Sequence, residues 1–234
     1  NVESYGYTIN NNENQTYGQA TKIIGGYSYS SVMPIEEGDI IGGTVSSGNA
    51  NNNIVSVNSI TVGTRTSNTA GGESMDGNVI GGYSSSGNAA GNMVSINSST
   101  VNGQITGGQI SGDSSYSASY NTVVVDNTSV DDVAGAANTY GNVSNNVVYI
   151  SNGSSVGSAQ GAHSSYGSVS GNAVYVDNST VSSYVQGGYA ENDVARNNSV
   201  DILSGSANYV YGAVANNGDV LYNSVNISGG TVEN

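Results

Sequence analysis

The sequence predicts an all-β fold, a parallel right-handed β-helix (β-solenoid) of about seven coils of about 26 residues. Three observations predict it. A phrase recurs along most of the chain, apolar residues alternate with polar ones inside each copy, and glycine or polar clusters separate the apolar segments. In such a fold, equivalent residues stack from coil to coil at the spacing of hydrogen-bonded strands, about 4.8 Å.

A pair of small residues sets the register of the repeat. From Gly81 onward the pairs follow one another at spacings of 26, 28, 26, 26 and 25 residues, whereas the first spacing is 39. The longer first spacing predicts an insertion at about 64–76, "TRTSNTAGGESMD". The pairs are Gly42-Gly43, Gly81-Gly82, Gly107-Gly108, Gly135-Ala136, Gly161-Ala162, Gly187-Gly188 and Gly212-Ala213.

Three later slots of each copy read Asn-x-Val-x-Val/Ile, which is the two-residue period of a strand with one face buried. The asparagines are Asn53, Asn92, Asn121, Asn146, Asn172, Asn198 and Asn223. The valines are Val55, Val94, Val123, Val148, Val174, Val200 and Val225. The last slot holds Val57, Ile96, Val125, Ile150, Val176, Ile202 and Ile227. We expect the valines and isoleucines to form one continuous core that a single copy could not bury.

Glycine, asparagine and serine clusters divide each copy into three short strands, and helices are not expected because no copy has a 3.6-residue apolar stripe. The repeated asparagines are expected to stack as a ladder of side-chain amides and to bond to the backbone at a turn. Their role is therefore interpreted as structural. The repeated glycines indicate tight corners that need a positive φ or a close backbone approach.

The slot between the two inward-facing positions should face outward. It places Tyr149 and Tyr175 in consecutive coils. Two interpretations are open: an aromatic stripe that contacts a sugar or a protein, and simple stacking of side chains along a sheet, which is the favoured one. These two tyrosines are the candidate surface contact.

Composition and charge exclude several classes of partner. The 234-residue chain has 3 Lys and Arg, 17 Asp and Glu and a formal net charge of −14. Nucleic acid is not an expected partner, because its binding needs cations that replace phosphate counterions. An anionic membrane surface is disfavoured for the same reason, and no apolar run reaches the roughly 18 residues of a membrane helix. The absence of cysteine fits a secreted protein that does not rely on disulfides.

The acidic residues do not form an evident active site in the repeat register. Asp126 and Asp177 share a slot but are two coils apart, with Ser151 between them, and no base lies nearby in sequence. We therefore expect no catalytic residue, no cofactor and no metal. A calcium ion at Asp126, Asp131 and Asp132 stays open as an alternative, because carboxylates suit it, although the motif G-G-x-G-x-D is absent.

The stretch "VIGGYSSSGNAAGNMVSINSSTVNGQITGG" (79–108) resembles repeats in the passenger regions of bacterial autotransporters and related surface adhesins. The phrases V-x-G-G-Y and N-x-V-x-I carry the resemblance, which covers roughly residues 40–234. It implies a β-solenoid, export from a Gram-negative cell, display outside the cell, and adhesion or surface structure. No active-site residue is implied, because these motifs are architectural.

The two ends of the repeat array differ. Residues 1–39 are off-pattern, apart from a partial copy that begins at Lys22, and are expected to be a cap or a docking element. Residues 40–234 hold the repeats, and the last copy stays in register up to Val232, which predicts an open edge. Head-to-tail stacking would cover that edge, and so would a continuation of the chain.

These features together predict a non-enzymatic extracellular structural protein, a building block of a surface filament or fibrous adhesin. Its expected partners are further copies of itself, with host or cell-surface glycans or proteins as additional candidates. The alternative is a polysaccharide-binding or polysaccharide-cleaving β-helix protein, which would gather carboxylates on one outward face.

Overall fold

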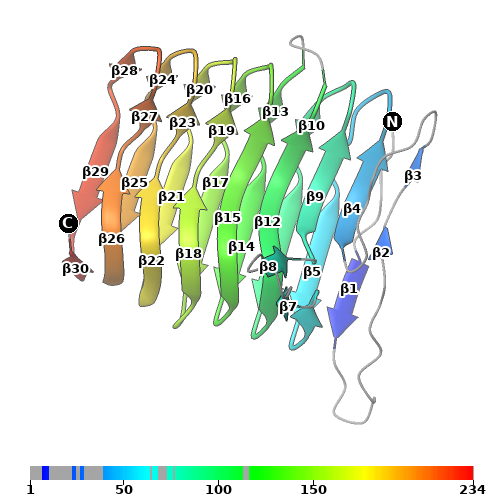
Figure 1. Cartoon of the computed structure of the whole chain (residues 1–234), viewed down its shortest axis with the longest axis horizontal. Coiled ribbons are helices and arrows are strands. Elements are labelled where there is room, and N and C mark those ends of the chain that lie inside the picture. Colours follow the sequence, from blue (N-terminus) through cyan, green and yellow to red (C-terminus); the bar gives the residue numbers. More distant parts are fainter. Residues whose placement is uncertain are drawn as a thin grey trace.

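The computed structural model describes residues 39–63, 77–112 and 116–233 in full, and the backbone of residues 7–10, 23–24, 27–28, 65–67 and 73–75. Every regular element in these parts of the chain is a β-strand. The strands stack in parallel into successive coils that follow one another along a single axis (Figure 1). The predicted all-β solenoid is therefore confirmed.

Each coil contributes strands to three sheets, which agrees with the predicted three strands per copy. We call the eight-stranded sheet, the fourteen-stranded sheet and the six-stranded sheet A, B and C, respectively. Sheet A consists, in spatial order, of β1 (Tyr7–Asn10), β5 (Ile54–Asn58), β11 (Met93–Asn97), β14 (Thr122–Asp126), β17 (Val147–Ser151), β21 (Ala173–Val176), β25 (Ser199–Ile202) and β29 (Ser224–Ile227).

Sheets B and C complete the cross-section. Sheet B comprises β2 (Ile23–Ile24), β3 (Tyr27–Ser28), β4 (Ile40–Val45), β6 (Thr61–Val62), β9 (Val79–Ser84), β12 (Thr100–Ile110), β15 (Ser129–Asn138), β18 (Ser155–Gln160), β19 (His163–Ser164), β22 (Ser179–Gln186), β23 (Tyr189–Ala190), β26 (Gly205–Tyr211), β27 (Val214–Ala215) and β30 (Thr231–Val232). Sheet C comprises β10 (Ala89–Ala90), β13 (Ala118–Ser119), β16 (Val143–Ser144), β20 (Val169–Ser170), β24 (Ala195–Arg196) and β28 (Val220–Leu221).

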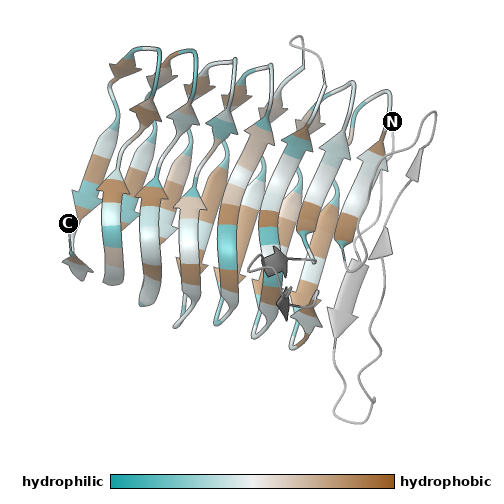
Figure 2. Ribbon diagram, in the orientation of Figure 1, coloured by the Kyte–Doolittle hydropathy of each residue, from teal (hydrophilic) through white to brown (hydrophobic). Residues whose placement is uncertain are grey.

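The register predicted from the repeat is the register of the sheets. In sheet A, for example, Val94 pairs with Val55 on one side and with Val123 on the other. The asparagine column has seven rungs, from Asn53 to Asn223, and seven rungs delimit six full turns. Figure 2 shows the result as hydrophobic bands that recur from strand to strand.

The core divides into two columns of different bulk. The larger one lies between sheet A and the first part of the sheet B strands, and it is built from valine and isoleucine; Val94, Ile96 and Ile105 are fully buried. The second one lies beside sheet C and is rich in alanine, with Ala118 and Val143 fully buried.

The repeated glycine pair reflects a close approach of neighbouring coils. A Cβ atom added to Gly107 would lie 2.4 Å from the carbonyl oxygen of Gly135 and 2.9 Å from the Cβ of Asn121. This is closer than van der Waals contact allows, so the first glycine of the pair cannot gain a side chain without separating two coils. A positive φ explains a different corner glycine, Gly48, whose φ is 116°.

The described part of the off-pattern segment 1–39 extends the solenoid at its N-terminal end. Strand β2 pairs with β4, Ile23 opposite Ile40, so the partial copy at "KIIGGY" is in register. Strand β1 pairs with β5, Tyr7 opposite Val55. The order is unusual, because β1 precedes β2 in the chain although each later sheet A strand follows its own sheet B strand. The remainder of 1–38 lies outside the described residues.

The predicted insertion at 64–76 contains an antiparallel pair of strands, β7 (Arg65–Ser67) and β8 (Glu73–Met75). They pair with each other in a two-stranded sheet that is separate from sheets A, B and C. The solenoid resumes in register on both sides, since Val62 pairs with Val101 and Val79 pairs with Ile105. The other residues of the insertion lie outside the described part.

Candidate functional site

The seven repeated asparagines lie in one column and form a continuous hydrogen-bonded ladder. After the first rung, Asn53, the Oδ1 atom of each of the other six accepts two bonds from the asparagine one coil earlier, one from its backbone N–H and one from its Nδ2, at 2.8–3.0 Å. The second Nδ2 hydrogen reaches a backbone carbonyl, as from Asn121 to Ala89 at 2.9 Å. In the five interior rungs, from Asn92 to Asn198, both amide hydrogens and both oxygen lone pairs are used in this way, so these side chains offer no polar group to a ligand.

A second buried ladder is made of hydroxyl groups and was not foreseen from the sequence. The hydroxyl oxygens accept backbone N–H bonds from the preceding coil at 3.2–3.4 Å. The members are Ser99, Thr128, Ser154 and Ser179. Each lies two residues before the last inward valine of its copy. That fixed offset was the available signal, but serine and threonine are so frequent in this chain that the slot did not stand out.

Tyr149 on β17 and Tyr175 on β21 lie side by side on the outer surface of sheet A. Their ring centroids are 5.0 Å apart with an interplanar angle of 12°, so each ring covers a face of the other. Partial burial raises the pKa of Tyr175 above its ordinary value of 10.0, with smaller contributions from Tyr149 and from Asp201 on the next strand. This geometry favours stacking along the sheet over a flat aromatic platform, because a sugar would need the covered faces.

Other aromatic side chains stack in the same way between coils. Tyr140 lies on Tyr166 at 5.3 Å, and His163 lies on Tyr189 at 5.2 Å. The Nε2 atom of His163 is also 3.3 Å from a carboxylate oxygen of Glu191. Stacked rings one coil apart are thus a recurring feature of this surface.

Three of the carboxylates that were considered for catalysis or calcium, those of Asp126, Asp132 and Asp177, are bonded to polar neighbours. Asp126 accepts hydrogen bonds from Asn152 at 2.7 Å and from Ser151 at 3.3 Å, and Asp177 accepts one from Ser204 at 2.6 Å. Asp132 lies on sheet B and accepts a bond from a serine hydroxyl. Within residues 39–63, 77–112 and 116–233, no three His, Cys, Asp or Glu side chains come close enough to hold a metal ion.

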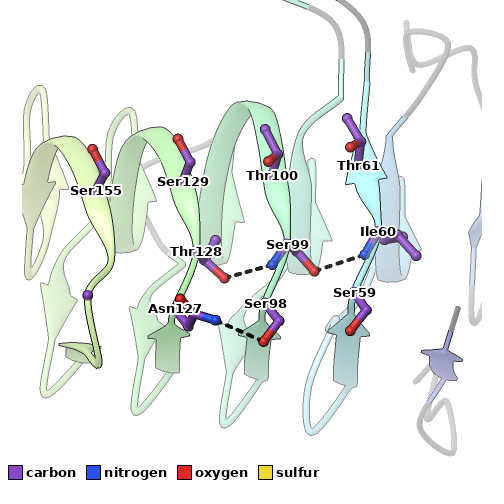
Figure 3. A pocket seen from close by; sticks show the side chains of 11 residues that line it. Ser59, Ile60, Thr61, Ser98, Ser99, Thr100, Asn127, Thr128, Ser129 and Ser155 are labelled. Atoms are coloured by element: carbon purple, nitrogen blue, oxygen red, sulfur yellow. Dashed lines mark hydrogen bonds between the residues drawn. The ribbon is translucent and has the colours of Figure 1, made fainter.

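An open groove lies at the corner where sheet A strands turn into sheet B strands (Figure 3). Its volume is about 450 Å³, and it crosses four consecutive coils. One wall is a row of hydroxyls in register, and the rest of the lining is uncharged, with polar side chains beside Ile60 and Gly153. The first wall consists of Thr61, Thr100, Ser129 and Ser155.

The C-terminal coil presents core positions to solvent. Val225 and Ile227 are 43% and 48% exposed, whereas Val200 and Ile202, one coil earlier in the same columns, are fully buried. Val220 and Leu221 on the last sheet C strand are exposed as well. Strands β28 and β29 are the last members of sheets C and A, so they have one open hydrogen-bonding edge each.

The fold and surface define the class of protein: a parallel β-solenoid whose stacked coils are tied by an asparagine ladder. Comparisons with family models, with curated proteins and with solved structures find no match to this chain. Over the part of the chain that the structure describes, no helix is long and apolar enough to cross a membrane.

Proposed function

We propose that this chain is a non-enzymatic structural protein, a β-solenoid rod displayed outside a bacterial cell that joins end to end into a surface filament or a fibrous adhesin. One observation carries the proposal: the last coil exposes residues of columns that are buried in every complete coil. Full burial of a valine or isoleucine side chain would stabilise the joint between two copies by about 1.5–3 kcal/mol. Pairing of the edge strand with a second copy would also prevent its non-specific pairing with other chains.

The extracellular and bacterial part of the proposal rests on the resemblance to autotransporter passengers and on composition. The chain has no cysteine, and its 234 residues include only 3 Lys and Arg. A rod of this kind gains its stability from contacts between neighbouring coils, so it can be extended by adding coils without a new core. Such extension suits a protein whose task is to bridge distance at a surface.

Electron microscopy of the purified chain at increasing concentration tests the proposal. We expect filaments, and we expect the Ile227→Asp variant to abolish them, because a carboxylate at the joint could not be buried. Ser224→Asp is the matched control on the same strand, since it adds the same charge at a position outside the core columns. Isolated rods at every concentration, or equal loss of filaments in both variants, would contradict the proposal.

A second candidate function is the binding of a neutral polysaccharide in the groove of Figure 3. The favouring observation is the row of in-register hydroxyls at strand spacing, which offers repeated donors and acceptors without charge. Binding of soluble neutral glycans, measured by calorimetry, should be weakened at least tenfold by Thr100→Val together with Ser129→Ala, since each lost hydrogen bond contributes about 1 kcal/mol. Thr122→Val, on sheet A, is the control and should bind as the unmodified chain does.

A further inference from the structure

We propose that strands β1, β2 and β3 of a second copy complete the open C-terminal end of the rod, in register, as one additional coil. The inference rests on the end-to-end joining proposed above and names the elements that form the joint. The partner is a second copy of this chain, and the joint is parallel, because every strand pair between coils in this rod is parallel.

Sheet A supplies the first half of the argument. Its two terminal strands are β1 and β29, and all of its strands run in the same direction. Tyr7 and Ile9 pair with Val55 and Val57, which begin the columns that end at Val225 and Ile227. A copy translated along the axis therefore brings Tyr7 opposite Val225 and Ile9 opposite Ile227.

Sheet B independently requires the same translation. Ile23 on β2 pairs with Ile40, whose column ends at Val210 on β26. Tyr27 on β3 pairs with Thr44, whose column ends at Val214 on β27. Strand β30 already pairs with Ser206 and Ala207 of β26. The later part of β26, at Val210, and the edge of β27 would thus receive β2 and β3 of the second copy while β29 receives β1.

The chain order of the N-terminal strands fits a joint better than another internal coil. Strand β1 fills the sheet A place beside β5, yet it comes before β2 and β3 in the sequence. Among the described residues of this coil, β1 pairs with β5, and β2 and β3 pair with β4. Repeating one translation from copy to copy is a heterologous contact that does not close, so the product is a filament.

The charge of the chain sets the condition for assembly. The net charge is −14, and exposed Asp219 and Glu233 lie in the last coil. Like charges at a joint repel, and salt screens them over about 10 Å at 0.1 M. We expect assembly to increase when the sodium chloride concentration is raised, and the test is run at several such concentrations.

Disulfide trapping tests the register, and the chain is suited to it because it contains no cysteine. Paired residues on adjacent strands lie within the Cα separation that a disulfide spans, about 4.4–6.8 Å. Under mild oxidation, Ile9→Cys with Ile227→Cys should give a ladder of covalent multimers on a non-reducing gel, about tenfold stronger than Ile9→Cys with Asn226→Cys, which shifts the pair by one residue to the other face. Ile9→Cys with Val57→Cys should close within one chain.

The outcomes separate this inference from the proposed function. Filaments together with equal trapping of the in-register and shifted pairs would overturn the joint while leaving end-to-end assembly standing. Failure of the Ile9–Val57 pair to close would also overturn it, because β1 would then not lie beside β5. If neither the unmodified chain nor the double-cysteine chains form filaments under reducing conditions, the proposed function itself fails.

Discussion

The asparagine ladder permits a quantitative prediction in the middle of the rod, the substitution Asn121→Ala. Its side chain accepts the backbone N–H and the Nδ2 of Asn92 at 3.0 and 2.9 Å, and it donates to the Ala89 carbonyl and to Asn146 Oδ1 at 2.9 Å each. Alanine leaves two buried donors of Asn92 and the Ala89 carbonyl without these partners. At about 1–2 kcal/mol for each orphaned group, the free energy of unfolding should fall by about 3–6 kcal/mol.

Urea denaturation followed by circular dichroism measures this loss, and Asn97→Ala is the control. Asn97 is exposed on β11 in the coil before Asn121, and its Oδ1 accepts one bond from a neighbouring serine hydroxyl. Its removal should change the free energy of unfolding by less than about 0.5 kcal/mol. If Asn121→Ala destabilises the chain no more than Asn97→Ala does, the ladder is not a source of stability and the reasoning is refuted.

Three further predictions address other columns of the rod. Gly107→Ala should destabilise strongly in thermal melts because its Cβ would meet a neighbouring carbonyl oxygen at 2.4 Å, whereas Ala136→Gly, at the second place of a pair, should cost about 1 kcal/mol or less. Thr128→Val should lower the unfolding free energy by about 1–3 kcal/mol, since a buried N–H loses its acceptor; an unchanged urea midpoint would contradict this. The raised pKa of Tyr175 means that its neutral form is favoured in the fold. The stability that the neutral Tyr175 side chain contributes is fully present below pH 10.0 and is lost as the pH rises through the raised pKa. An NMR titration should show that Asp201→Asn lowers the pKa of Tyr175.

The sheets and the main core could be predicted because equivalent residues of successive repeats pair directly in the sheets. When Asn-x-Val-x-Ile recurs at nearly constant spacing, parallel stacking is the arrangement that buries every valine against its own copies, and Val94 does lie between Val55 and Val123. The stacking of Tyr149 on Tyr175 follows from the same rule, since they occupy one outward slot in consecutive coils. In such a fold each repeat contacts only its neighbours, so the repeat register largely determines the tertiary contacts.

Features that depend on composition or on chain order could not be predicted in this way. The hydroxyl ladder at Thr128 uses residue types that are abundant throughout the chain, so its fixed position in the repeat could not be distinguished from chance. The placement of β1 beside β5 uses a short stretch, "YTIN", whose match to the repeat is weak because the chain reaches it out of order. The groove arises from a corner between two sheets, and a corner has no apolar period of its own.

Stability and assembly in this rod have the same physical origin, which leads to a last prediction. Each internal coil is supported from both sides, whereas the final coil is supported from one, and alternate amides of a parallel strand point to opposite neighbours. The backbone N–H groups of the repeated asparagines point to the following coil, as that of Asn53 does toward Asn92. The amides of Val225 and Ile227, two and four residues after Asn223, should therefore exchange hydrogen rapidly in isolated rods. They should become protected in filaments, whereas the amides of Val148 and Ile150 should be protected in both states. Rapid exchange at Val225 in the assembled state would show that filaments form through some other surface, and slow exchange in dilute rods would show that the last coil is stabilised without a partner.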